Sequence, residues 1–142
     1  MADRTSLAGL RGRDKLPKYC YLSLNTQIDS AMVRILELLP AIDFGSTVCC
    51  RLHHVRLEDA PAYSAISYCW GKSVNRGSVH IGHSHISVTD NLEDALRHLR
   101  QSNQSTILWV DAICIDQSNI DERHRQIRLM QRIYQSSRMT LI

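Results

Sequence analysis

Two segments of this chain each consist of an apolar run, expected to be buried, followed by a polar or glycine-containing turn. In each segment a tryptophan lies close to the end of the apolar run. The segments span residues 63–71 and 108–117. An indole face can stack on a base or a nicotinamide ring, glycine lets the backbone approach a ligand, and a carboxylate can hydrogen-bond a ribose hydroxyl. The two ends therefore supply the candidate ligand-binding residues: Tyr68, Trp70, Gly71, Asp111, Asp116 and Gln117.

A purely structural role is open for each of these side chains. For Asp111 we favour capping of the backbone N–H groups in the turn that follows it, as such carboxylates often do. Asp116 and Gln117 are expected to order the loop first and to contact a ligand second. Trp70 either offers a stacking face or packs beneath the next loop, with neither favoured, whereas Trp109 is expected in the core.

Other side chains could carry catalysis or bind metal. Glu122 is a candidate catalytic carboxylate, but a position in the first turn of a helix also explains it, because the helix dipole favours negative charge there. We favour that structural role, and we expect Cys114 to be buried and unreactive. Three histidines share one hairpin without the partners of a tetrahedral site, so we expect no metal and no cofactor: His80, His83 and His85.

The elements that position these residues follow from the hydrophobic pattern. An apolar run over 32–39 and an alternating segment over 48–53 predict an N-terminal β-hairpin. Apolar residues at helical spacing predict helices over 90–101 and 119–136, the second with Asp121 and Arg125 as an ion pair on its outer face. Further strands are expected over 65–70, 79–81, 86–88, 106–111 and 139–142.

Strands and helices alternate along the second half of the chain, which is typical of a parallel sheet with right-handed crossovers. We therefore predict an α/β fold with a mostly parallel sheet flanked by helices. In this arrangement the strands over 65–70 and 106–111 lie side by side and point the same way. Trp70, Gly71 and Asp111 then lie on the edge where open α/β sheets bind ligands.

Length and composition limit the class of protein. A chain of 142 residues, 44% hydrophobic and 22% charged, is typical of one soluble domain. It has no bilayer-spanning apolar run and no secretory signal, and its five cysteines form no C-x-x-C pair, so we expect a cytoplasmic protein. Residues 1–28 are basic and are expected to be flexible. The net charge of +3, without a dense basic face, argues against nucleic-acid binding.

Three blocks of the sequence resemble the fungal heterokaryon incompatibility (HET) domain. They lie at residues 63–71, 88–96 and 109–134 and read Y-x-A-I-S-Y-x-W-G, V-T-x-N-L-x-x-A-L and W-V-D-A-I-C-I-x-Q, the last followed by Q-x-x-x-M-x-x-I-Y. Their order matches the family, and the departure is Asp116, where the family has asparagine. We assign 29–142 to the N-terminal portion of a HET domain.

The resemblance implies a role in fungal non-self recognition, a form of innate immunity in which such domains act as effectors of programmed cell death. It also implies a distant relation to TIR domains, which have a flavodoxin-like α/β fold and in some cases cleave NAD with a catalytic glutamate. The later family block that would hold that glutamate is absent, so we expect an incomplete, non-enzymatic domain. It would act through protein partners or self-association at the strand over 139–142; a TIR-like NAD hydrolase is the alternative.

Overall fold

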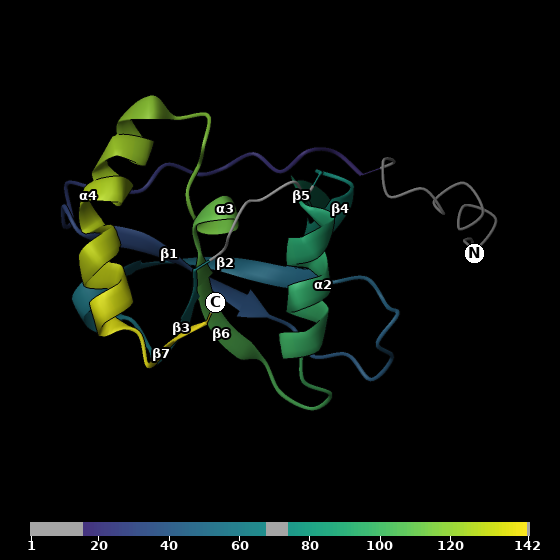
Figure 1. The fold of residues 1–142 in the computed structure, drawn as a ribbon. Helices are drawn as coiled ribbons and strands as arrows, with labels where there is room; N and C mark the ends of the chain where they lie inside the picture. The colour runs from purple at the N-terminus through teal and green to yellow at the C-terminus, as the bar shows by residue number, and fades with distance from the viewer. Residues whose placement is uncertain (1–15, 68–73, 142) are drawn as a thin grey trace.

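The computed structural model describes residues 16–67 and 74–141 as an α/β fold built on one seven-stranded sheet (Figure 1). Its α-helices are α2 (Asp90–Leu99), α3 (Asp111–Cys114) and α4 (Ile120–Ser136), and a 3-10 turn, η2, spans Leu57–Asp59. Its strands are β1 (Met32–Leu38), β2 (Cys49–Arg56), β3 (Ser64–Ile66), β4 (Gly77–Ile81), β5 (Ser84–Val88), β6 (Thr106–Val110) and β7 (Met139–Leu141). Both predicted hairpins and both predicted helices are therefore present.

The sheet is mixed, and the prediction of a mostly parallel sheet is wrong. The strand order is β5-β4-β2-β1-β6-β3-β7. β1 runs antiparallel to both β2 and β6, and β4 runs antiparallel to β5, whereas the pairs β2–β4, β3–β6 and β3–β7 are parallel. The longest ladder, with seven residue pairs, is the antiparallel one between β1 and β2. Nothing in this topology supports a flavodoxin-like or TIR-like fold.

β1 occupies a central position because both of its faces are apolar. Val33 and Ile35 lie on one face and Leu36 and Leu38 on the other, and none is more than 2% exposed. A strand of this kind needs a neighbour on each edge and packing on each face. The hairpin partner β2 covers one edge and β6 the other. The alternation of strands and helices further along the chain does not indicate that β1 lies between β2 and β6.

The described parts of the two predicted segments, β3 and β6, lie side by side and run in the same direction, as predicted. β3 pairs in parallel with β6, with Ile66 opposite Val110. Both strands therefore reach the same edge of the sheet, where Ser67 follows β3 and Asp111 follows β6. Three of the predicted ligand-binding residues lie outside the described part of the chain, so the predictions for them stay untested: Tyr68, Trp70 and Gly71.

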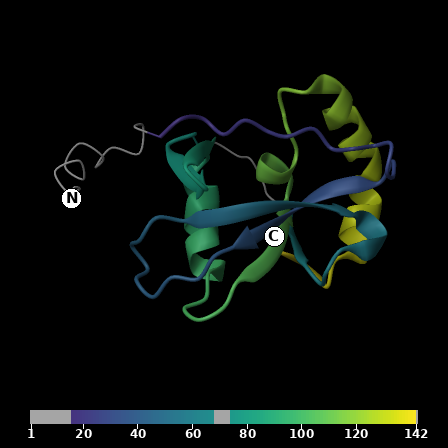
Figure 2. The same cartoon turned by 180° about the vertical axis from the view of Figure 1, so that it is seen from behind.

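The three helices lie on one face of the sheet. They stand in front of the strands in Figure 1, and in Figure 2, seen from behind, β2 crosses in front of α2. Side-chain caps start the two longer helices. Thr89 Oγ1 accepts the N–H of Leu92 at 3.1 Å, and Asn119 Oδ1 accepts the N–H of Glu122 at 3.0 Å. These caps fix where each helix begins.

Part of the segment predicted to be flexible packs against the domain. The Tyr19 N–H donates to the His85 carbonyl at 2.8 Å, and the His85 N–H donates to the Pro17 carbonyl at 2.9 Å. Residues 17–19 therefore cover the outer edge of β5, and Leu24 is buried further along. Residues 1–15 are outside the described part of the chain, so the prediction stays untested there.

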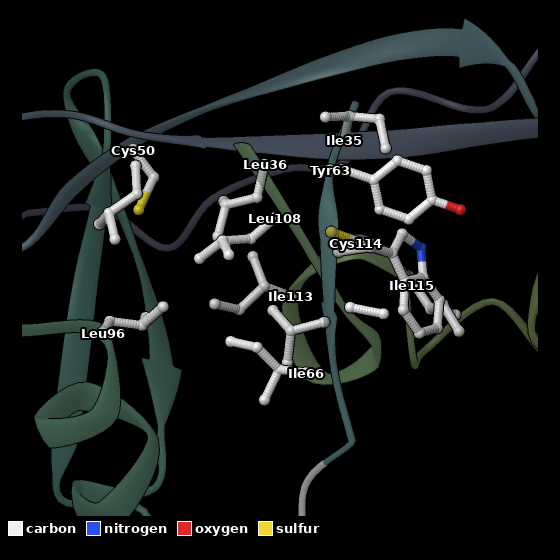
Figure 3. Close-up of a cluster of buried hydrophobic side chains, with 14 of the residues drawn as sticks. Ile35, Leu36, Cys50, Tyr63, Ile66, Leu96, Leu108, Ile113, Cys114 and Ile115 are labelled. Carbon is white, nitrogen blue, oxygen red and sulfur yellow. The ribbon is translucent and has the colours of Figure 1, made fainter. Parts of the chain in front are cut away.

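One apolar core joins the sheet to the helices. Figure 3 shows Leu36 and Leu108 from the sheet close to Ile113 of α3, with Leu96 of α2 further along the same cluster. Close packing of such side chains is the main stabilising contribution to a domain of this size. The core therefore holds β3, β6 and the start of α3 in one rigid arrangement.

Candidate functional site

Asp111 ends β6 at the sheet edge and opens α3. Its carboxylate interacts with its own backbone N–H and with that of Ala112, which favours the charged form, but burial has the larger effect and raises the pKa of Asp111. The buried Oδ1 accepts no hydrogen bond from a described residue. The contacts agree with backbone capping, and they leave one carboxylate oxygen able to accept from a further donor.

Tyr134 of α4 interacts with both Asp111 and Ser67, the residue that follows β3. Burial raises the pKa of Tyr134, the negative charge of Asp111 adds to that rise, and a hydrogen bond with the Ser67 side chain opposes it. The Tyr134 ring packs edge-on against Trp109, with ring centroids 5.7 Å apart. Trp109 is fully buried, as predicted, and its Nε1 has no acceptor among the described residues. We call these four residues the rim cluster.

The rim cluster brings together one carboxyl, two hydroxyls and an indole N–H. Such a set can donate and accept hydrogen bonds, and a carboxyl group with a raised pKa can exchange a proton with a molecule beside it. Nucleophilic catalysis needs a base beside the attacking hydroxyl. The partner of the Ser67 hydroxyl is instead the phenol of Tyr134. The described contacts of the cluster therefore fit the binding of a polar group.

Asp116 and Gln117 order the loop that follows α3. Gln117 Nε2 donates to the Asp111 backbone carbonyl at 2.9 Å. Asp116 Oδ1 accepts from the Ser118 N–H at 3.2 Å and from its hydroxyl at 2.7 Å. These contacts agree with the loop-ordering role expected first for both residues.

A buried ion pair between Arg34 and Glu122 lies beneath this loop. Arg34 Nη1 lies 2.6 Å from Glu122 Oε2 and Nη2 lies 2.9 Å from Oε1, with the two side chains 0% and 2% exposed. Arg34 also donates to the carbonyls of Cys114 at 3.1 Å and Leu22 at 2.7 Å. Glu122 Oε2 accepts the Asp116 N–H at 2.7 Å. One pair therefore joins β1, the N-terminal segment, α3, the loop and α4.

Two further hydrogen bonds support the same region. The Tyr21 hydroxyl donates to the Ile113 carbonyl at 2.6 Å, and the Tyr21 ring lies 4.8 Å from the Arg34 guanidinium carbon. Burial, the largest effect, raises the pKa of Tyr21, so the phenol remains a donor. Gln126 Nε2 donates to the Met32 carbonyl at 2.9 Å and holds α4 against β1.

Glu122 lies in the first turn of α4, as expected, and its buried ion pair adds a structural role that was not expected. Arg34 and the Asp116 N–H occupy its carboxylate, and the residue is 1% exposed, so a ligand at the rim cannot reach it. Cys114 is fully buried, and burial raises its pKa to about 12, which keeps it an unreactive thiol as expected.

Sequence reasoning missed Arg34, Ser67 and Tyr134. A signal existed for Arg34, because an arginine inside an apolar strand must find a buried acid.

The described part of the chain contains neither a candidate metal site nor a membrane-spanning helix. His80 and His85 lie opposite each other across the β4–β5 hairpin. Within residues 16–67 and 74–141, no three His, Cys, Asp or Glu side chains are grouped so that they could hold a metal ion. None of the helices in this described part has the length and apolar character needed to cross a membrane.

Comparison with known proteins points to the segments that build the rim. The family model for heterokaryon incompatibility protein (HET) matches residues 63–142, which is more than half of the chain. The chain belongs to the HET family. The match contains all four residues of the rim cluster and Glu122, whereas Arg34 precedes it. In this HET-domain protein the buried ion pair therefore ties the family segment to the N-terminal hairpin.

A curated relative extends the similarity toward the N-terminus. The chain is 28% identical over 137 residues to "Heterokaryon incompatibility protein 6, OR allele" of Neurospora crassa. The alignment covers 87% of this chain and 20% of the relative, so the chain spans about a fifth of that protein's length. No solved structure matches the chain. This is thus a heterokaryon incompatibility domain protein of fungal type.

Proposed function

We propose that this HET-domain chain is an effector and interaction module in fungal non-self recognition. It would act in the cytoplasm of fused, incompatible cells and promote their programmed death by contact with another copy of itself. Membership of the HET family and the name of the Neurospora relative support the biological role. The physical basis is the outer edge of the sheet at β7.

The backbone of Thr140 is the observation that carries this proposal. Leu141 faces β3, because its carbonyl accepts the Ser67 N–H at 2.7 Å. Successive residues of a strand alternate in direction, so the N–H and C=O of Thr140 point away from β3. β7 is the last strand in the sheet order, and Met139 and Thr140 are exposed. An edge strand with free backbone groups is a template for pairing with another chain.

The opposite edge of the sheet differs from β7. There Pro17 and Tyr19 exchange backbone hydrogen bonds with His85 of β5 and so cover that edge. Covering an edge in this way prevents strand addition. The contrast supports β7 as the edge at which a second copy pairs.

A test in fungal cells distinguishes self-association at β7 from NAD cleavage as the cause of cell death. The chain is expressed, in the protein that carries it, as wild type, Thr140→Pro and Thr140→Ala. Proline removes the outward N–H and leaves the bonds to β3, whereas alanine keeps the N–H. We expect cell death with wild type and Thr140→Ala and survival with Thr140→Pro.

The enzymatic alternative has its own readout in the same cells. NAD content and nicotinamide release are followed during the death reaction. Equal killing by Thr140→Pro, together with NAD loss that Asp111→Ala abolishes, would contradict the proposal and favour turnover at the rim.

A further inference from the structure

The outward side of α4 carries a row of arginines. Arg125, Arg128 and Arg132 recur at i, i+3 and i+7, and residues at this spacing lie on one side of a helix. We call these three residues the basic row. Arg128 and Arg132 are exposed and Arg125 is half-buried.

The basic row has no acidic partner among the described residues. In the part of the chain that the structure describes, none of its three arginines takes part in an ion pair or a hydrogen bond. The predicted pair between Asp121 and Arg125 does not form, and Glu122, the neighbouring acid, points inward to Arg34. A helix face of interleaved charges usually neutralises itself. This one leaves its positive charge directed outward.

Two exposed isoleucines lie beside the basic row. Ile120 and Ile127 are 61% and 53% exposed and, seven residues apart, lie on the same side of α4. His124 lies between them on the helix surface. An apolar pair flanked by cations is the composition of a docking surface with an apolar centre and a polar rim.

The inner side of α4 fixes this surface in place. Glu122 and Gln126 are bonded to β1, and Ile133 is fully buried in the core. The helix therefore cannot roll to bury its isoleucines. A surface that is already ordered loses little conformational entropy on binding.

We infer that this face of α4 docks an acidic amphipathic helix of another protein. Carboxylates at i, i+3 and i+7 of that helix pair with the basic row, and apolar side chains beside them cover Ile120 and Ile127. Charge complementarity selects an acidic partner over a neutral one. A nucleic acid is disfavoured because the exposed side of α4 offers no Phe, Tyr or Trp side chain for stacking. A membrane is disfavoured because two fixed isoleucines bury too little apolar area.

The test uses a synthetic peptide of about 18 residues, which as a helix is roughly 27 Å long and matches the 17-residue α4. It carries glutamates at i, i+3 and i+7 and leucines along the neighbouring row, and a second peptide has glutamine in place of glutamate. Binding to the purified chain is measured by fluorescence anisotropy at low and high salt. Phosphatidylserine vesicles and single-stranded oligo-dT are titrated in parallel.

The decisive variant is Arg125→Gln/Arg128→Gln/Arg132→Gln. Its matched control, Arg51→Gln/Arg56→Gln/Arg76→Gln, removes the same charge from exposed positions elsewhere. We expect the acidic peptide to bind wild type in a salt-sensitive manner and the basic-row variant to bind about tenfold or more weakly. The control variant and Thr140→Pro should bind as wild type does, which separates this inference from the proposed function.

Several results would overturn the inference. These are equal weakening in both triple variants, equal binding of the glutamine peptide, absence of peptide binding, or preferential binding of vesicles or oligo-dT. Thermal unfolding of each variant confirms that the folded state is being compared.

Discussion

Arg34 is a charged residue at the centre of an apolar strand, and its environment explains why it is tolerated. A buried guanidinium is costly unless its donors are satisfied and its charge is paired. Glu122 supplies the charge, and the carbonyls of Cys114 and Leu22 accept further hydrogen bonds from the two Nη atoms, whereas Nε has no partner among the described residues. The ion pair thus positions the segment that carries Asp111.

Glu122→Gln tests this role. It leaves the Arg34 charge buried beside a neutral amide, and loss of one member of a buried pair costs about 3–5 kcal/mol. We expect a loss of that order in the free energy of unfolding, measured by urea denaturation. The matched change Asp121→Asn, on the exposed neighbour, should cost no more than about 0.5 kcal/mol. Similar small losses in both variants would show that the pair contributes little.

Gly77→Ala tests a close approach between β4 and α2. A Cβ at Gly77 would lie 2.8 Å from Glu93 Oε1 and 2.8 Å from the Thr89 carbonyl. Glu93 is itself held, because Oε1 accepts the Ser78 N–H at 2.7 Å and the carboxylate pairs with Arg97. We expect a destabilisation of about 1–3 kcal/mol in chemical unfolding. Gly45→Ala is the control, since its Cβ would meet Asp43 Oδ1 at an ordinary 3.6 Å, and equal effects would contradict the argument.

Asp111→Asn has a pH-dependent effect with a definite sign. Burial, the largest cause, raises the pKa of Asp111 above its ordinary 3.8, so the folded state holds the proton to higher pH than the unfolded state does. Wild type therefore loses stability as the pH rises from the unfolded pKa through the folded pKa. Asparagine cannot ionise, so the variant does not lose stability in this way. The melting temperature of the variant, relative to that of wild type, should rise between pH 4 and pH 7. A melting-temperature difference that stays constant or shrinks over this range would contradict a raised pKa.

At the scale of elements, the 43–47 loop depends on one side chain. Arg100, just after α2, donates to the carbonyls of Thr47, Asp43, Phe44 and Ser46 at 2.9 to 3.3 Å. Arg100→Lys loses the planar fork that reaches several acceptors at once. We expect faster hydrogen exchange at the Gly45 and Ser46 amides without a change in global stability. Unchanged exchange would show that the Asp43 turn alone orders the loop.

The sequence was sufficient for local elements and insufficient for their assembly. Alternation and helical spacing predicted both hairpins, α2 and α4, because those patterns are local. The parallel pairing of β3 with β6 followed from the same pattern. The antiparallel insertion of β1 did not, because it depends on contacts with β6 some 70 residues later in the sequence. α3 was missed because four residues are too few to show a helical period.

The residues of the candidate site also differ in whether the local sequence pattern indicates them. Asp111, Asp116 and Gln117 were predicted as candidates because they follow a strong strand signal, and Asp111 does lie at the shared edge. Their binding of a ligand stays a prediction. Ser67 and Tyr134 reach that edge only through the tertiary packing of β3 and α4. The residue types alone could not indicate such an approach.

For the molecule as a whole, a sheet with two unlike edges is the central feature. Residues 17–19 cover β5, whereas the backbone of Thr140 in β7 faces outward. The rim cluster and the basic row of α4 lie on the half of the sheet toward β7, within the segment that matches the HET family. A module that works by contact would concentrate its contact surfaces in this way.

Analytical ultracentrifugation of the purified chain measures whether the β7 edge mediates self-association. We expect concentration-dependent self-association of wild type and Thr140→Ala, and a monomer for Thr140→Pro with an unchanged unfolding transition. A wild-type chain that remains monomeric at all concentrations, or a proline variant that associates equally well, would contradict this expectation.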